Sequence, residues 1–221
     1  NLFTRNLTAQ TGRSKWLVGA AFAYLCALLS KESAITALPV FPLIAWTFFG
    51  QSASRSLALS LWALAPILAF FLLRGSALSG LTAPAVSYMD NPIVAAKGFG
   101  ERFSTSFVVL GKYLWLLFVP ITLLSDYSYN AFPLAKPGDL FSLLSLVVHL
   151  GLLGWALWQL PHRNPVACCV LVYFAGIALY SQLPAVIGTL MGERLLYTPS
   201  LWWCIAVPLV AGHFLNFAKS T

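Results

Sequence analysis

The sequence has few charged residues. Of its 221 residues only 9% are Asp, Glu, Lys or Arg, with 13 basic and six acidic side chains, whereas a soluble domain carries about 25%. This scarcity excludes a soluble enzyme domain and a disordered segment. The net charge is +7, but the basic residues are scattered singly and form no run that could follow a nucleic-acid backbone. We therefore expect no nucleic-acid partner.

The sequence also lacks the common signatures of metal and cofactor sites. It contains no GxGxxG, P-loop, HExxH or GxSxG pattern. Its four cysteines lie in apolar stretches without CxxC spacing, and its three histidines are isolated: Cys26, Cys168, Cys169, Cys204, His149, His162 and His213. We interpret the cysteines as small buried side chains and the histidines as packed or interfacial residues. No metal and no cofactor is expected.

Hydrophobic residues are abundant, at 59% of the chain, and aromatic residues make up 14%. A helix needs about 20 apolar residues to cross a bilayer. Seven apolar segments are long enough, or nearly so, to be candidate spans: Trp16–Leu29, Ala34–Phe49, Leu57–Leu73, Phe103–Leu124, Leu140–Leu160, Val166–Leu183 and Leu201–Phe217. The first two are short, and either borrow flanking residues or form a tight hairpin. The sequence predicts an all-α, polytopic bundle of about seven transmembrane helices.

Three polar stretches separate these segments. Residues 74–102 and 125–139 are too polar, or too interrupted by Gly and Pro, to be spans. Tyr127, Tyr129 and Phe132 in the second stretch suit an interfacial position. The third stretch, residues 181–200, carries Glu193 and Arg194.

Two positions place ionisable side chains among apolar residues, where each costs about 2.5–3.5 kcal/mol at mid-membrane. Lys31 and Glu32 either form a polar turn in the headgroups or lie at the rim of a polar cavity, where Lys31 would meet a phosphate. Lys112 lies about 14 Å along the segment that starts at Phe103, by the helical rise. It either snorkels to the interface or faces the bundle with a carboxylate or phosphate partner.

The remaining candidates lie within the three polar stretches. Glu193 and Arg194 are either an interfacial ion pair at a helix start or a phosphate site, because an Arg guanidinium matches phosphate geometry. One helical turn places Tyr197 beside Arg194. Asp90 and Asp126 each either form a turn, or act as a base or as an acceptor for a sugar hydroxyl.

Three segments resemble one family. LCALLSKESAITALPVFPLIAW resembles the "lLcKEqgit" segment of the transmembrane and tetratricopeptide-repeat O-mannosyltransferases. The stretch from YMDNPIVAAKGFGERF to SDYSYNAFPL is similar to that family's conserved segment, in which a DNP triplet precedes an arginine, a membrane run and a D-[YW]-S motif. MGERLLYTPSLWWC is similar to its "AERvLYiPSmgfC" signature. The motifs occur in the family's order over about residues 22–210.

The resemblance implies a GT-C glycosyltransferase in the membrane. Residues 1–221 would form part of its transmembrane domain, with the family's conserved segment at residues 74–139. The implied reaction transfers a sugar, mannose in this family, from a polyprenyl-phosphate donor to a hydroxyl of a protein or glycan acceptor. The implied location is the endoplasmic reticulum membrane or a bacterial inner membrane. The family's catalytic acids and C-terminal repeats would lie outside these residues, so no catalytic residue is assigned.

The resemblance also implies roles for the candidate residues. Arg194 would bind the donor phosphate, with Tyr197 as a hydroxyl donor, and Lys31 and Lys112 would be further cations. Glu193 and Glu32 would orient those cations. Sugar or acceptor hydroxyls would contact the following residues: Asp90, Asn91, Asp126 and Tyr127.

Two questions remain open at the level of sequence. Seven full crossings would place Asp126 and Arg194 on one side of the membrane and Lys31 and Asp90 on the other. Either one short segment does not cross, or only one pair serves the chemistry, and we favour Arg194 with Asp126. The alternative function is a non-catalytic membrane scaffold or a transporter of lipid-linked sugars. We expect a hollow beneath Arg194 and Tyr197 if the transferase hypothesis holds.

Overall fold

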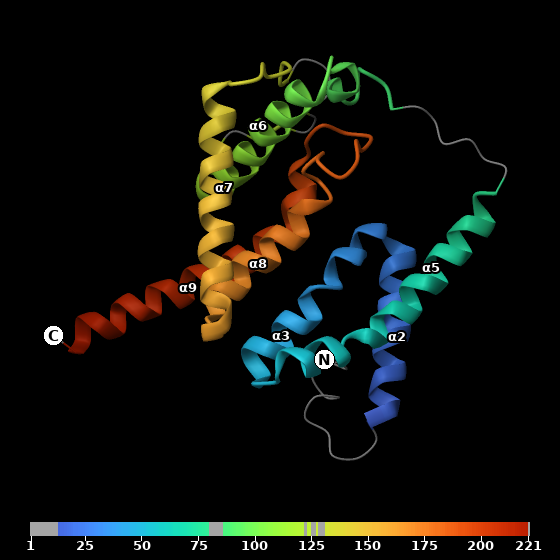
Figure 1. The fold of residues 1–221 in the computed structure, drawn as a ribbon, viewed down its shortest axis with the longest axis vertical. Coiled ribbons are helices and arrows are strands. Elements are labelled where there is room, and N and C mark those ends of the chain that lie inside the picture. Colours follow the sequence, from blue (N-terminus) through green and yellow to red (C-terminus); the bar gives the residue numbers. More distant parts are fainter. Residues whose placement is uncertain (1–12, 80–85, 122, 125–126, 128–130, 221) are drawn as a thin grey trace. The chain divides into compact units, whose positions relative to one another are not determined.

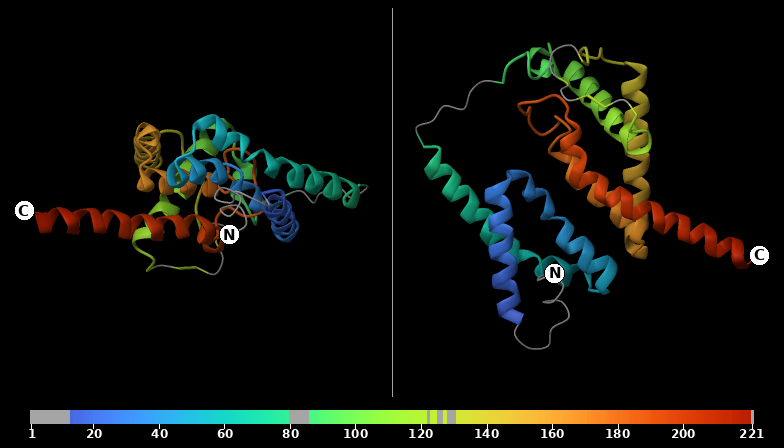
Figure 2. Two further views of the ribbon diagram at one scale, coloured as in Figure 1. Left: turned by 90° about the horizontal axis from the view of Figure 1, so that it is seen from below. Right: turned by 180° about the vertical axis from the view of Figure 1, so that it is seen from behind.

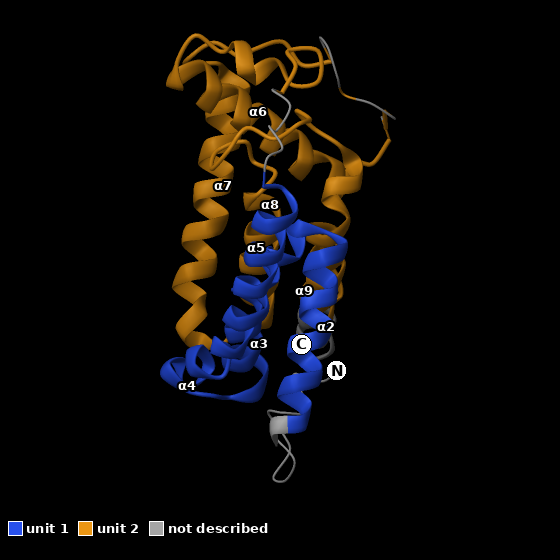
Figure 3. Ribbon diagram, turned by 90° about the vertical axis from the view of Figure 1, so that its right-hand side faces the viewer, with its two compact units in different colours: residues 1–83 blue, residues 84–221 orange. Residues whose placement is uncertain are grey.

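The structure, a computed structural model, describes residues 13–79, 86–121, 123–124, 127 and 131–220. All regular elements in these ranges are helical (Figure 1). The chain divides into two compact units, residues 1–83 and 84–221 (Figure 3), and each is described by itself. The prediction of an all-α fold is confirmed.

Residues 13–79 of unit 1 form three longer helices and three short ones. They are α2 (Arg13–Ser30), η1 (Glu32–Ala37), α3 (Val40–Phe49), α4 (Ala53–Ala58), η2 (Leu61–Ala63) and α5 (Leu64–Ala77). Helix α2 packs on α5 and η1, and α3 packs on α4. The core centres on Tyr24, whose ring contacts Phe41 at 5.4 Å and Trp62 at 6.0 Å, both edge-on. Aromatic pairs prefer this geometry, so α2, α3 and η2 share one core.

The described part of unit 2 contains four longer helices and three short 3-10 helices. Its elements are η3 (Pro92–Ala95), α6 (Phe99–Phe118), α7 (Leu140–Gln159), η4 (Leu160–His162), α8 (Pro165–Ala178), η5 (Glu193–Leu196) and α9 (Tyr197–Ser220). Helix α6 packs on α7, α7 on α8, and α8 on α9, and Figure 2 shows this sequence of helices from two further sides. The core combines side chains from α6, α8 and the connection between α8 and α9.

Polar side chains set several helix starts. The Asp139 carboxylate accepts a hydrogen bond from the Ser142 amide at 2.9 Å, so Asp139 caps α7. Asn164 caps α8 in the same way, accepting from Val166 at 2.9 Å. Pro165 occupies the first turn of α8, where its missing N–H costs nothing. In unit 1, Gly50 ends α3 with φ +64°, a backbone conformation that favours glycine.

Four helical segments are long and apolar enough to cross a membrane: Glu32–Phe49, Ala53–Ala77, Leu140–His162 and Glu193–Gly212. Two shorter apolar helices, Lys15–Ser30 and Pro165–Ala178, accompany them. These helices bear out a polytopic membrane bundle. The expected count of seven spans stays a prediction.

Two expected spans are composite, and a third is shorter than expected. The segment Ala34–Phe49 lies within the span Glu32–Phe49, which comprises η1 and α3, with Pro39 at the N-cap position of α3. The segment Leu57–Leu73 lies within the span Ala53–Ala77, which comprises α4, η2 and α5. Helix α6 ends at Phe118 instead of continuing to Leu124, because Pro120 lacks an N–H and restricts the residue before it. Helix α6 is absent from the candidate spans above.

Candidate functional site

A buried amide pair joins the DNP triplet to the connection between α8 and α9. Asn91 and Gln182 are both fully buried. The Asn91 amide donates to Gln182 Oε1 at 3.1 Å and to the Ile187 carbonyl at 2.8 Å. Its Oδ1 accepts from the Ile93 amide at 3.1 Å. Both amide hydrogens of Asn91 are therefore used within the chain, and none is left to donate to a sugar.

Gln182 extends this network along the connection. Its Nε2 donates to the carbonyls of Thr189 at 2.7 Å and Leu190 at 3.1 Å, and its Oε1 also accepts from the Ile187 amide at 3.1 Å. Gln182 has φ +62°, which is uncommon for a residue with a side chain. One buried glutamine thus closes the backbone of residues 182–190 into a loop.

Arg102, at the start of α6, fastens the same loop. Its Nε and Nη2 donate to the Gln182 carbonyl at 3.2 and 2.9 Å, and Nη2 also donates to the Leu183 carbonyl at 3.1 Å. This arginine, which follows the DNP triplet in the sequence, is committed to backbone oxygens.

Two tyrosines hold the residues next to Arg194. The Tyr113 hydroxyl accepts from the Gly192 amide at 2.9 Å and lies 3.3 Å from the Gly192 carbonyl, to which it donates. The Tyr127 hydroxyl donates to Glu193 Oε1 at 2.7 Å, and the Leu124 amide donates to the same oxygen at 2.8 Å. Glu193 therefore binds the loop after α6 instead of orienting Arg194.

Two of the family-like segments, the one with the DNP triplet and the one with Glu193 and Arg194, consequently meet in unit 2. The amide of Leu190, four residues before Arg194, donates to the Asp90 carbonyl at 3.3 Å. Seven full crossings would place Asp90 and Arg194 on opposite sides of the membrane, whereas this contact places the Asp90 backbone beside the connection that carries Arg194. Helix α6 contacts the same connection through Arg102 and Tyr113. The number of crossings and the side on which each loop lies stay predictions.

Burial and the carboxylate of Glu193 change the pKa of the Tyr127 phenol. Tyr127 is only 2% exposed, and its ring stacks on Phe132 with centroids 5.8 Å apart. Burial, together with the hydrogen bond to Glu193 and that group's negative charge, raises the pKa of Tyr127 to about 12. The phenol therefore stays protonated and remains a donor to Glu193.

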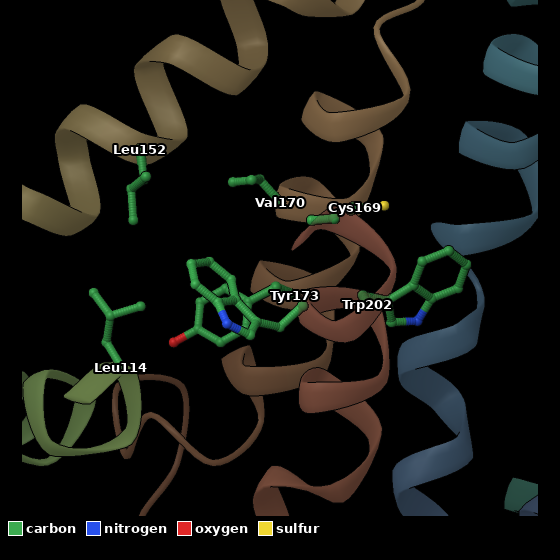
Figure 4. Close-up of a pocket in the computed structure, with 8 residues that line it drawn as sticks. Leu114, Leu152, Cys169, Val170, Tyr173 and Trp202 are labelled. Carbon is green, nitrogen blue, oxygen red and sulfur yellow. The ribbon is translucent and has the colours of Figure 1, made fainter. Parts of the chain in front are cut away.

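Among the described residues of unit 2, four pockets bear on these candidates. The void in Figure 4 has a volume of about 10 Å³, room for about one water. It is closed by side chains from α6 to α9, including Leu114, Leu152, Tyr173 and Trp202. A pocket of about 280 Å³ lies among α6, α7 and α8. Larger open grooves follow residues 132–139, at about 620 Å³, and the α7–α8 turn, at about 700 Å³.

Arg194 and Tyr197 line none of these four pockets. Arg194 is exposed, and Tyr197 is 83% exposed. The expected hollow beneath them is not found at these places. In the part of the chain that the structure describes, no carboxylate pairs with Arg194.

The other candidates of unit 2 are placed as follows. The Asp90 side chain is exposed beside the buried Asn91. Lys112 is half-buried on α6, six residues before the end of that helix at Phe118, or about 9 Å by the helical rise. That distance makes snorkelling easier than a span to Leu124 would. Asp126 lies outside the described residues.

The Lys31–Glu32 pair lies in unit 1, in the turn between α2 and η1. Glu32 pairs with Arg74 at the end of α5, and the Arg74 guanidinium also lies 5.9 Å from the Phe70 ring centroid. Glu32 therefore does not orient Lys31, whose side chain is exposed. Both side chains of the Arg74–Glu32 pair are about half exposed, so the pair contributes little stability.

Sequence reasoning missed four residues that organise these sites: Arg74, Arg102, Tyr113 and Gln182. Arg102 and Gln182 carried a weak signal, as polar residues at the edges of apolar segments. Tyr113 was missed because the functional signal in this segment was assigned to the neighbouring charged residue, Lys112. The partner of Glu32 is 42 residues away, and nothing in the local sequence indicates it.

Comparison with known proteins supports the resemblance. Protein O-mannosyl-transferase TMTC1 of Mus musculus is 33% identical over 133 residues, which cover 57% of this chain and 14% of the relative. Protein O-mannosyl-transferase TMTC2 of Homo sapiens is 30% identical over 173 residues, covering 71% of this chain and 20% of the relative. The chain is thus similar in sequence to protein O-mannosyl-transferases over more than half of its own length.

Two further comparisons gave no match. No family model matches the chain, and no solved structure matches it significantly. The chain spans between one seventh and one fifth of the length of the curated relatives it matches.

Proposed function

We propose that this chain is the membrane part of a glycosyltransferase that moves mannose from a polyprenyl phosphate to a hydroxyl group of a protein. The names of its relatives support transfer of mannose to protein. The helices that can cross a membrane support a lipid-linked donor. In the transfer, the bond between the sugar and the phosphate breaks, the acceptor oxygen bonds to the sugar, and polyprenyl phosphate leaves. No residue of this chain is assigned as the base that takes the acceptor proton.

Arg194 is the residue proposed to bind the donor phosphate. Negative charge grows on the leaving phosphate, and a planar guanidinium stabilises it by charge-assisted hydrogen bonds. The observation that carries this proposal is that the residues next to Arg194 already have hydrogen-bond partners within the chain. Glu193 is held by Tyr127 and Leu124, and Gly192 by Tyr113, so Arg194 is left exposed and, among the described residues, without a carboxylate partner. Because the expected hollow beneath Arg194 is not among the pockets described above, the phosphate would bind at an exposed surface.

Two other exposed side chains of unit 2, those of Tyr197 and Asp90, have supporting roles in the proposal. Tyr197 would donate its hydroxyl to the phosphate, and Asp90 would accept from a sugar or acceptor hydroxyl. Asn91, Tyr113, Tyr127 and Glu193 act as positioning residues, because their polar atoms hold the backbone that carries Arg194 and Asp90.

The test is Arg194→Ala in the full-length protein in membranes. Transfer from polyprenyl-phosphate mannose to a protein acceptor is followed together with donor affinity. We expect kcat/KM to fall about 10- to 100-fold, the worth of one charge-assisted hydrogen bond of about 1.5–3 kcal/mol. Arg194→Lys keeps the positive charge but lacks the planar pair of guanidinium donors, so we expect its kcat/KM to lie between those of Arg194→Ala and the unaltered protein.

Lys97→Ala is the matched control, because Lys97 is another exposed cation of unit 2. We expect it to transfer mannose normally. Normal transfer with unchanged donor affinity in Arg194→Ala would remove Arg194 from the mechanism. Donor binding without any transfer by the intact protein would favour the scaffold or transporter instead.

A further inference from the structure

A buried histidine with an unpartnered ring nitrogen lines the pocket of about 280 Å³ in unit 2. The pocket lies among α6, α7, α8 and the start of the α8–α9 connection, helices that Figure 1 labels. Its lining is apolar except for His149 and Ser181, and comprises Phe107, Leu110, His149, Leu150, Leu153, Phe174, Ile177, Ala178, Ser181, Leu183 and Pro184. None of these residues takes part in the hydrogen bonds that Glu193 accepts from Leu124 and Tyr127.

The contacts of His149 fix which nitrogen carries the proton. Nδ1 lies 2.7 Å from the Ser145 carbonyl oxygen and 3.3 Å from the Ser145 hydroxyl. A carbonyl oxygen can only accept a hydrogen bond, so Nδ1 is the protonated nitrogen. In the neutral ring, Nε2 is then an acceptor with a free lone pair.

Nε2 has no hydrogen-bond partner among the described residues. The side chain is 3% exposed, and the rings of Phe107 and Phe174 approach it edge-on at 6.2 and 6.0 Å. The Ser181 hydroxyl cannot help, because it donates to the Ala178 carbonyl at 2.7 Å and accepts from the Leu183 amide. A buried acceptor without a donor is unfavourable, and such groups usually indicate a missing partner.

We propose that this pocket binds a membrane-dissolved alcohol, whose hydroxyl donates to Nε2 of His149 and whose hydrocarbon part lies on the apolar lining. The apolar walls exclude a charged ligand, and the acceptor nitrogen requires a donor. The volume is near the lower end for ligand pockets, which begin at about 300 Å³, so the site fits a short chain or one end of a long one. Because Nε2 is buried, a flanking phenyl ring must turn before the hydroxyl reaches it.

The test uses the full chain in lipid nanodiscs with two matched probes, a photoreactive long-chain alcohol and its methyl ether. The ether keeps the hydrocarbon and the oxygen but cannot donate. We expect the alcohol to bind about 5- to 10-fold more tightly than the ether, the worth of one hydrogen bond. In His149→Phe this preference should vanish while ether binding changes less than about twofold.

Two further variants guard against misfolding and non-specific labelling. Ala178→Phe fills the pocket and should block the binding of both probes, although His149 itself is unchanged. His162→Phe removes a histidine of η4, which follows α7 and does not line this pocket, and should keep the preference for the alcohol. Equal binding of alcohol and ether to the unaltered chain would overturn the proposal. Tighter binding of the ether, or a preference for the alcohol that persists in His149→Phe, would do the same.

Discussion

Replacing Asn91 with leucine should destabilise unit 2 more than any exposed substitution nearby. Asn91 is 0% exposed and makes three hydrogen bonds, to Gln182, Ile187 and Ile93. Leucine fills a similar volume but leaves the Ile187 carbonyl and the Ile93 amide without partners. Each orphaned buried group costs about 1–3 kcal/mol, so the expected loss is about 2–6 kcal/mol.

The measurement is thermal unfolding of the full chain in detergent, followed by the loss of helical circular dichroism. A loss of about 4 kcal/mol corresponds to a fall in Tm of roughly 8–16 °C for a chain of this size. A local readout is amide hydrogen exchange in residues 182–190, which should become faster because Asn91 and Gln182 close that loop.

The matched control is Asp90→Asn, since Asp90 is exposed and contacts Leu190 only through its backbone. We expect a change within about 0.5 kcal/mol. A double-mutant cycle with Gln182→Leu should show coupling of about 1 kcal/mol, because the two amides bond directly. If Asn91→Leu matches Asp90→Asn in both Tm and exchange, the network does not hold the loop.

Two other predictions concern the loop after α6 and the α6–α7 contact. Subtracting the ultraviolet titration of Tyr127→Phe from that of the unaltered chain should reveal a phenol with a pKa of about 12. Because this pKa is raised above the ordinary 10, the phenol's contribution to stability should be complete below pH 10 and disappear as pH rises through about 12; a phenol titrating near 10 would refute the buried bond to Glu193. In Gly111→Ala the new Cβ would lie 2.9 Å from the Ser145 hydroxyl, so α6 and α7 must separate and thermal unfolding should show a loss of about 1–3 kcal/mol. Gly151→Ala, whose Cβ would meet nothing within 4 Å, should be neutral or stabilising by up to about 1 kcal/mol, and equal effects of the two substitutions would contradict this packing.

Local sequence predicted the helical segments well where a single helix lies between clear stop signals. Leu140–Leu160 was expected and α7 runs from Leu140 to Gln159, because Asp139 caps its start and Pro161 follows its end. The end of α8 was less well predicted, since the expected segment ran to Leu183, whereas residues 179–183, apolar except for Ser181 and Gln182, fold into the connection to α9. Apolar character alone does not separate a helix from a buried loop.

The sequence by itself determined that the chain lies in a membrane and that its regular elements are helices. A chain with 9% charged residues and long apolar segments that do not alternate with polar residues satisfies its backbone hydrogen bonds in lipid as helices, because the strands of a membrane barrel would show that alternation. Only the tertiary structure decided which polar groups pair, as with Asn91 and Gln182, Tyr127 and Glu193, or Glu32 and Arg74. These partners are 91, 66 and 42 residues apart, and helix packing, rather than local pattern, brings them within hydrogen-bond distance.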